Sequence, residues 1–256
     1  MRGALTQMHV VFAVLLRETK TRFGDNQLGY LWAFISQGLM IGMFIAFYGL
    51  FGRVAPSGMS LVAYLTTGIV PYSLFRDTAT KCMAAVDSNK GLLFYPQVRP
   101  LDLVMARALL EAVTYLCVMA LFLGGLALYS GPPRIESFLR AFMGFAMASA
   151  CGAGLGLLAC GLSIFTPTVE RLFPSILRVT FWFSAVFHPV ESLPKAMREI
   201  ILLNPLTHAI ELVRDGWFPG YDARSADPSY VLAWILVLAF LGLSVERMAR
   251  RRLELT

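Results

Sequence analysis

Charged residues are scarce in this chain. Asp, Glu, Lys and Arg make up 15% of its 256 residues, whereas hydrophobic residues make up 57%. Because soluble domains contain roughly 25% charged residues, this composition excludes an ordinary soluble domain. The basic residues flank apolar stretches and form no stripe, so the net charge of +6 does not indicate a nucleic-acid-binding protein.

The sequence also has few residues that bind metals or form disulfides, with three histidines and four cysteines. Three of the cysteines lie inside apolar runs, which indicates packing. His208 and Glu211 have a spacing compatible with a metal pair, but with only His188 nearby we favour local hydrogen bonding and predict no metal site. The sequence contains no P-loop, so the chain is not expected to hydrolyse ATP by that route. No cleavable signal peptide is predicted.

Long apolar runs are the main feature that the sequence does have. Spans of roughly 20 residues match a hydrocarbon core of about 30 Å. We predict an all-α polytopic membrane protein with one domain, residues 1–256, and six transmembrane helices. The six spans are expected at about residues 29–51, 61–75 with a short extension, 103–129, 138–165, 172–190 and 229–245.

The basic residues predict the orientation. With both termini in the cytoplasm, 15 of the 22 Lys and Arg residues lie on the inner side, including the basic C-terminal stretch RMARRR. Cytoplasmic loops are enriched in Lys and Arg. We therefore predict a multi-pass protein of a bacterial inner membrane with both termini cytoplasmic.

Two segments do not fit the pattern of a span. Residues 1–27 form an amphipathic basic segment, which we predict to be an interfacial helix, and Tyr30 and Trp32 follow at the headgroup level. Residues 191–227 contain two short apolar segments, 194–203 and 206–217, separated by an Asn204-Pro205 helix start. Each is too short to cross a bilayer, so we predict a re-entrant hairpin on the outer side.

The inner loop at residues 76–102 carries an apolar tetrad, Leu92–Tyr95, which we expect to be exposed. It either folds back onto the membrane or docks a partner protein. Arg107 and Glu111 follow at a spacing that favours an ion pair or a snorkelling pair. A stripe of small residues from Gly144 to Cys160 predicts close helix packing, either within the subunit or across a dimer.

Three stretches carry a resemblance to a known family: LRETKTRFGDNQLGYLWAF near the N-terminus, the region from Asn89 to Glu111, and NPLTHAIELVRDGWFPGY from Asn204. They resemble permease subunits of ABC exporters of bacterial capsular polysaccharide. One departure is Gln37, where that family usually has proline.

The resemblance implies the partners of the chain. We expect a homodimer, a separate ABC ATPase that binds ATP and magnesium, a lipid-linked capsular glycan, and periplasmic and outer-membrane export components. The chain itself would be a transport subunit without an enzymatic activity. The coupling residues implied for the ATPase contact are Asn89, Gly91, Leu92, Leu93, Phe94 and Tyr95.

Two substrate-facing regions are also expected. The basic residues Arg17, Lys20 and Arg22 would stand where an anionic glycan is loaded, although plain membrane anchoring explains them equally well. A moving glycan needs many weak contacts, which aromatic faces supply. The candidate conduit aromatics are Trp32, Phe44, Tyr48, Tyr72, Phe75, Phe181, Trp182 and Phe187.

There are three alternatives to the export of capsular glycan. One alternative is an exporter of another surface glycan such as O-antigen. A membrane-embedded transferase would need paired acid/base groups, but its candidates, Asp102, Glu111, Glu170 and His188, are scattered. An ion-coupled transporter would place ionisable groups near the midplane and repeat its topology, and the sequence shows neither feature.

Overall fold

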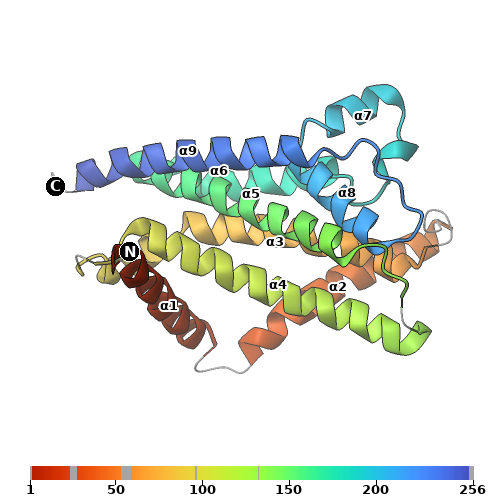
Figure 1. Cartoon of the computed structure of the whole chain (residues 1–256), viewed down its shortest axis with the longest axis horizontal. Coiled ribbons are helices and arrows are strands. Elements are labelled where there is room, and N and C mark those ends of the chain that lie inside the picture. The colour runs from red at the N-terminus through yellow and green to blue at the C-terminus, as the bar shows by residue number, and fades with distance from the viewer. Residues whose placement is uncertain (1, 24–27, 53–58, 96, 132, 254–256) are drawn as a thin grey trace.

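The computed structural model describes residues 2–23, 28–52, 59–95, 97–131 and 133–253. All regular elements within these ranges are helices, which confirms the predicted all-α class (Figure 1). The α-helices are α1 (Arg2–Phe23), α2 (Leu28–Leu50), α3 (Leu61–Met83), α4 (Pro100–Ser130), α5 (Phe138–Phe165), α6 (Thr168–Thr180), α7 (Lys195–Ile201), α8 (Pro205–Trp217) and α9 (Pro228–Leu253). The short 3-10 helices are η2 (Asp87–Leu92), η3 (Phe181–Phe183) and η4 (Val190–Ser192).

Four helices in the described residues are long and apolar enough to cross a membrane, namely α2 from Leu31, α4, α5 and α9 up to Ala249. They match the first, third, fourth and sixth predicted spans. The second predicted span is α3, which is longer than expected but too polar to count by composition. The fifth, at 172–190, is not one helix, because α6 ends at Thr180, η3 follows, and the chain then turns. Six spans therefore stay a prediction.

Helix α5 lies at the centre of the packing, and its small residues are the reason. A Cβ added at Gly152 would lie 2.6 Å from the carbonyl oxygen of Phe75 on α3, and one at Gly144 would lie 2.5 Å from that of Ala209 on α8. Only the absence of side chains lets these backbones approach so closely. The small-residue stripe thus packs within the subunit, which resolves the alternative that the sequence left open.

Local signals in the sequence place the starts of two helices. The backbone N–H of Arg99 donates to Asp102 Oδ2 at 2.8 Å, and Pro100 occupies the first turn of α4. At α8 the Asn204 side chain accepts from the N–H of Leu206 at 3.0 Å, as the Asn-Pro pair predicts. The two short helices predicted at 194–203 and 206–217 are present as α7 and α8, while their re-entrance stays a prediction.

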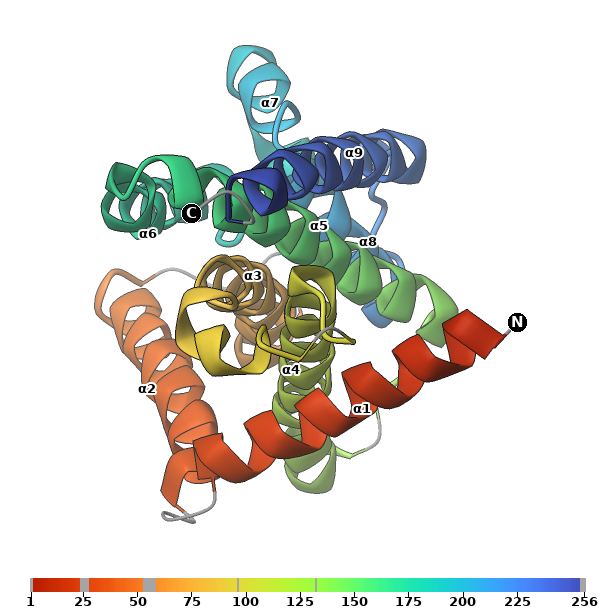
Figure 2. The same ribbon diagram turned by 90° about the vertical axis from the view of Figure 1, so that its left-hand side faces the viewer.

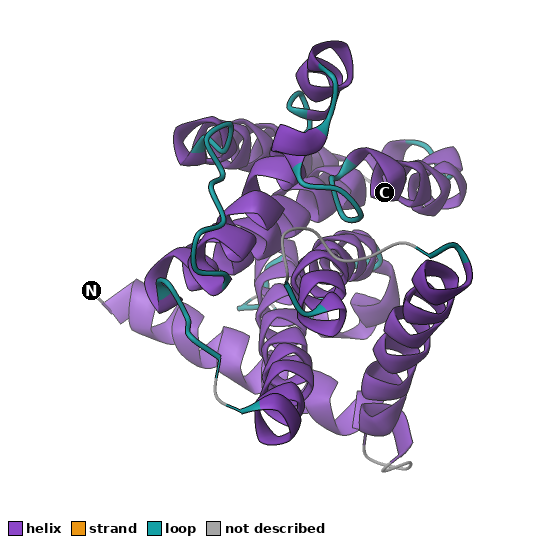
Figure 3. Ribbon diagram, turned by 90° about the vertical axis from the view of Figure 1, so that its right-hand side faces the viewer, coloured by secondary structure: helices purple, strands orange, loops and turns teal. Residues whose placement is uncertain are grey.

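The two ends of the bundle differ. At one end, which we call the Met83 end, α1 crosses the bundle and packs against α4 (Figure 2). The buried residues Val11 and Val14 of α1 form a small second core with α3 and α4. The other end, which we call the Ser60 end, carries the loops around α7 and α8, and α7 projects from the bundle there (Figure 3). The interfacial position of residues 1–27 stays a prediction, and residues 24–27 lie outside the described ranges.

Candidate functional site

Seven of the eight predicted conduit aromatics form one cluster, which we call the aromatic cluster. Its members are Phe44 and Tyr48 of α2, Tyr72 and Phe75 of α3, and Phe181, Trp182 and Phe187 in and after η3. Phe181 is its centre, with ring centroids at 4.7 Å from Tyr72, 5.1 Å from Phe187 and 5.6 Å from Trp182. The cluster therefore joins three segments that are far apart in the sequence.

Hydroxyl groups tie the aromatic cluster to the backbone. Tyr48 OH donates to the carbonyl oxygen of Phe187 at 2.9 Å, and Tyr72 OH donates to that of Leu177 near the end of α6. Tyr72 and Phe181 are buried, whereas Trp182 is 65% exposed. Within one chain these rings are packed against each other, and Trp182 forms the open edge.

Trp32 is the one predicted aromatic that the structure keeps apart from this cluster. It lies three helical turns before Phe44 on α2, about 18 Å along the axis, and it is 65% exposed. The sequence placed it near the headgroups as well as among the conduit residues. Its position at the headgroups stays a prediction.

A cavity of about 310 Å³ with cationic side chains lies beside the aromatic cluster, toward the Met83 end. We call it the cationic cavity, and its lining residues are Arg76, Asp77, Thr80, Lys81, Pro174 and Arg178. Arg76 Nε pairs with Asp77 Oδ1 at 2.8 Å, and Tyr115 OH donates to the same carboxylate. Lys81 Nζ pairs with Glu111 Oε2 at 2.6 Å.

The cationic cavity could not be predicted from local sequence patterns, because its residues come from two separate segments. Three cations and one carboxylate line this space, and among the described residues exposed Arg178 forms no ion pair. The available signal was the charged pair Arg76-Asp77 at the end of the second predicted span. Charges at such a position usually face protein or water and mark functional paths.

The predicted coupling residues lie on and after η2. Phe94 and Tyr95 are 88% and 64% exposed, and we call them the docking pair. Leu92 and Leu93 are half-buried against the small core beneath α1, so the expectation of four exposed apolar residues is wrong for these two. Leu92 and Leu93 anchor the loop to the small core, while the side chains of the docking pair are exposed. Gly91 is exposed, and Asn89 is buried.

A polar network holds this loop to α1 and α4. The Asn89 amide donates to Glu18 Oε1 at 2.7 Å, and Arg17 Nη1 donates to Asn89 Oδ1 at 3.3 Å. Arg107 Nε also binds Glu18 at 3.1 Å, and its Nη1 donates to the carbonyl oxygen of Lys81 at 2.9 Å. Glu18, which the sequence gave no reason to select, is thus the hub of the network.

This network corrects one interpretation of the sequence and refines another. Arg107 and Glu111 do not pair with each other, because Arg107 turns toward Glu18 on α1 while Glu111 binds Lys81. Of the predicted loading residues, Arg17 and Lys20 are exposed on α1, and Arg17 reaches the network. The side chain of Arg22 lies outside the described residues.

The ring nitrogens of His208 are both occupied by local hydrogen bonds. Nε2 lies 2.8 Å from the carbonyl oxygen of Leu202, and Nδ1 accepts from the N–H of Asp227 at 3.0 Å. Glu211, three residues away, instead accepts from Tyr221 OH at 2.8 Å. These bonds agree with the local role that we favoured for the His208–Glu211 pair.

Arg214 is a buried cation that sequence analysis missed. Its guanidinium carbon lies 4.1 Å from the centroid of the Tyr64 ring. Nη1 donates to the carbonyl oxygen of Ala185 at 2.7 Å and lies 3.3 Å from Glu211 Oε1. A charge in such a position needs an ion pair and hydrogen bonds to offset its lost hydration. These contacts fasten the turn after η3 to both α3 and α8.

The sequence of the chain is similar to those of known membrane transport proteins. A family described as ABC-2 type transporter matches residues 9–218. The polysialic acid transport protein KpsM of Escherichia coli is 29% identical over 245 residues, which cover 96% of this chain and 95% of that protein.

Two further relatives have related descriptions. The capsule polysaccharide export inner-membrane protein CtrC of Neisseria meningitidis serogroup A is 29% identical over 248 residues, covering 96% of this chain and 92% of CtrC. BexB of Haemophilus influenzae, with the same description, is 24% identical over 248 residues, covering 97% of this chain and 94% of BexB.

Proposed function

The chain belongs to the ABC-2 type transporter family, and on that premise we propose that it is the membrane subunit of an ATP-driven exporter of capsular polysaccharide in a bacterial inner membrane. The observation that carries this proposal is the similarity to KpsM and CtrC over 96% of the chain. Those two proteins are described as a polysialic acid transport protein and a capsule export protein, and the similarity extends through nearly their whole lengths.

The proposed topology has six spans and cytoplasmic termini. Helices α2, α4, α5 and α9 are long and apolar enough to span. Helix α3 would form the second span inside the bundle, where neighbouring helices shield its polar groups, and α6 with η3 would form the fifth. The distribution of Lys and Arg supports a cytoplasmic Met83 end. The short helices α7 and α8 would then form the re-entrant hairpin at the outer side.

Two copies of the chain would enclose the path of the glycan. Helix α2 presents a ridge of exposed apolar residues, including Leu39 and Met43, which is suited to a second subunit. The aromatic cluster lies where α2 meets α3 and η3, and its exposed edge at Trp182 would face that second copy. Ring faces hold sugars by many weak contacts, so the glycan can advance without having to leave a tight binding site at each step.

The glycan would arrive on a lipid anchor from the cytoplasmic side. The cationic cavity opens between α3 and α6 at the Met83 end, below the aromatic cluster. Guanidinium and ammonium groups bind phosphate and carboxylate through charge-assisted hydrogen bonds. Arg17 and Lys20 would add attraction at the headgroup plane, where each basic residue contributes about 1 kcal/mol. We assign the Arg178 side of the cavity to the first contact with an anionic group.

A separate ABC ATPase would bind ATP and magnesium and dock on the docking pair. Two adjacent exposed apolar side chains on a loop, as Phe94 and Tyr95 are, would suit a contact with another protein. The network through Glu18 and Asn89 would transmit movement of the ATPase to α1 and α4. Periplasmic and outer-membrane components would carry the glycan onward.

The ATPase contact gives a direct test of the proposed function. Phe94→Asp should place an unpaired charge in an apolar contact and weaken ATPase binding by about 2 kcal/mol. The measurement is co-purification of the ATPase, together with capsule display in a strain that lacks its own permease. The matched variant Phe94→Leu keeps the apolar contact and should preserve both. Normal binding and export by Phe94→Asp would contradict this docking surface.

The cationic cavity is tested by a second pair of variants. Arg178→Gln should reduce export of an acidic capsular glycan, while ATPase co-purification stays normal. Arg171→Gln is the matched control, because Arg171 is an exposed arginine on the same helix outside the cavity. Equal export by the two variants would exclude the cavity as the loading site. If the wild-type chain restored another surface glycan but no capsule, the proposed substrate class itself would be wrong.

A further inference from the structure

An apolar groove runs along the outward face of α4 and α5, on the side of the bundle away from α2 and α6. Two cavities make up this groove, one of about 440 Å³ and one of about 470 Å³. They share Leu116, Phe142 and Phe145, so their surfaces are continuous. The larger one, nearer the Ser60 end, is lined by apolar residues alone. A surface of this kind inside a membrane meets lipid chains or another protein.

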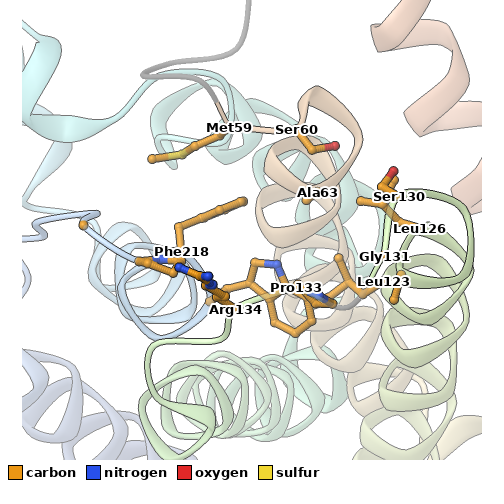
Figure 4. Close-up of a pocket in the computed structure, with 14 residues that line it drawn as sticks. Met59, Ser60, Ala63, Leu123, Leu126, Ser130, Gly131, Pro133, Arg134 and Phe218 are labelled. Atoms are coloured by element: carbon orange, nitrogen blue, oxygen red, sulfur yellow. The ribbon is translucent and has the colours of Figure 1, made fainter.

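The groove changes character at the Ser60 end, where it opens into a third cavity of about 460 Å³. Trp217 and Pro133 line both this mouth and the larger apolar cavity. Ser60, Ser130 and Arg134 bring hydroxyls and a positive charge to the mouth. Figure 4 shows Arg134 beside Phe218 on one side of this pocket, with Leu126 and Ser130 of α4 on the other.

The charge of Arg134 is not neutralised by an ion pair among the described residues. Its neighbour Arg140 differs, because Arg140 Nη1 pairs with Asp215 Oδ2 at 2.8 Å. The mouth therefore offers one cation with room for an anion beside it. Trp217 lies at the boundary between the apolar groove and this polar mouth, which is the depth that tryptophan favours at a membrane interface.

We propose that this groove and its mouth bind one anionic phospholipid, with an acyl chain between α4 and α5 and the phosphate at Arg134. The polarity of the site follows that of a lipid, apolar along the chain and cationic at the headgroup. Arginine binds a phosphate through paired N–H donors. A lipid seated there links the Ser130 end of α4 to Trp217 at the end of α8. The inference requires only that α4 and α5 span the membrane, so it is independent of the proposed export function.

The test uses lipids whose brominated chains quench tryptophan fluorescence at contact. A full-length chain with Trp32, Trp182 and Trp234 replaced by Phe retains Trp217 as the only tryptophan. It is placed in phosphatidylcholine nanodiscs that contain brominated phosphatidylglycerol or, separately, brominated phosphatidylcholine. We expect phosphatidylglycerol to quench Trp217 with about fivefold higher apparent affinity, the contribution of one basic residue at the headgroup plane.

Two variants locate the binding site. Arg134→Gln should abolish the preference for phosphatidylglycerol, while Arg224→Gln should retain it, since Arg224 is an exposed arginine that pairs with Asp222 outside the mouth. Ala120→Phe fills the groove and should reduce quenching by both lipids. Its control, Leu128→Phe, changes a residue that is 91% exposed and does not line the groove.

Three results would overturn the proposal. The first is equal quenching of Trp217 by the two lipids, which would mean that the mouth does not select an anion. The second is a preference that survives Arg134→Gln. The third is the same preference at Trp234 in a chain that keeps only that tryptophan, because the selectivity would then belong to the whole protein surface and not to this groove. None of these measurements involves ATP or glycan, so a failure of the export proposal would leave them unchanged.

Discussion

Helices α2 and α3 each have 23 residues and run side by side, yet their surroundings are opposite. In α3, 17 residues are buried, including Thr66, Thr67 and Ser73. In α2, three of the described side chains are buried, those of Gln37, Ile41 and Tyr48. The helix with more polar residues is thus inside the protein, and the more apolar helix is outside.

The difference shows how a lipid solvent reverses the usual pattern of burial. Lipid chains are as apolar as leucine, so apolar surface gains little by turning inward. Hydroxyl groups must instead find partners, and Thr66 and Thr67 donate to the carbonyl oxygens of Val62 and Ala63 at 2.7 Å and 2.9 Å. Composition therefore detects α2 as a span and misses α3. Substitutions on the two helices should therefore have different effects.

Glycine replacements should have the largest effect, and only on the buried side. Gly152→Leu would push a side chain into the backbone of α3, where a Cβ already lies 2.6 Å from Phe75 O. We expect destabilisation of more than about 3 kcal/mol and little folded protein by fluorescence-detected size exclusion. Gly42→Leu in α2 meets nothing within 4 Å of its Cβ and should fold normally. Equal yields of the two variants would contradict the difference in packing between α5 and α2.

A charge on the exposed ridge of α2 should have the next largest effect. Leu39 is 66% exposed, and at such a site on a soluble protein an arginine would change stability by about 0.5 kcal/mol or less. Near the centre of a span, where the ridge meets lipid or the apolar surface of a second copy, Leu39→Arg should instead cost roughly 2.5 kcal/mol. The readout is the amount of chain inserted in the membrane, with Leu39→Phe as the apolar control. An unchanged amount for Leu39→Arg would mean that this ridge faces water.

The residues where α2 meets α3 should affect transport more than stability. Phe44→Leu together with Tyr48→Leu keeps the apolar volume but removes the ring faces and the bond to Phe187 O. Each aromatic pair contributes about 0.5–1.5 kcal/mol, so we expect a modest loss of stability and a clear loss of glycan export. Capsule display at equal membrane abundance measures this. Normal display would exclude these two rings as conduit residues.

The smallest effect is expected for a single hydroxyl on α3. Tyr72→Phe removes the bond to Leu177 O, which still accepts from Thr180 Oγ1 at 2.7 Å. Because that carbonyl keeps a partner, the free energy of unfolding should fall by only about 0.5–1.5 kcal/mol. A thermal shift assay measures the change. Tyr129→Phe, at a 92% exposed position, should cause no shift, and an equal shift in both variants would contradict the role of burial.

Apolar length and local capping signals were enough to predict several elements. The fourth predicted span matches α5 residue for residue, and Asn204 caps α8 as expected. These features depend on neighbours within one or two turns, so they can be read directly from the chain. The fifth predicted span, at 172–190, was expected to be one helix. The apolar run there gave no signal for the turn after η3, which is held by contacts from Arg214 on α8.

The candidate site was predicted only in part. Aromatic composition selected the rings that form the cluster, but it also selected Trp32, which shares their chemistry and lies elsewhere on α2. The cationic cavity escaped prediction because Arg76 and Arg178 meet only when α6 packs beside α3. The docking pair was predicted as half of an apolar tetrad, since the sequence does not show that Leu92 and Leu93 turn toward α1.

By itself, the sequence determined that this is an all-helical chain of membrane-spanning composition that resembles capsule-export permeases. These properties follow from hydropathy, periodicity and short motifs, which are local. The tertiary structure alone decided which charges pair and which side of each helix is buried. Arg107, for example, pairs with Glu18 and not with Glu111. Such choices depend on contacts between residues tens of positions apart. Apolar side chains are equally suited to protein and to lipid, so hydropathy cannot distinguish these two environments.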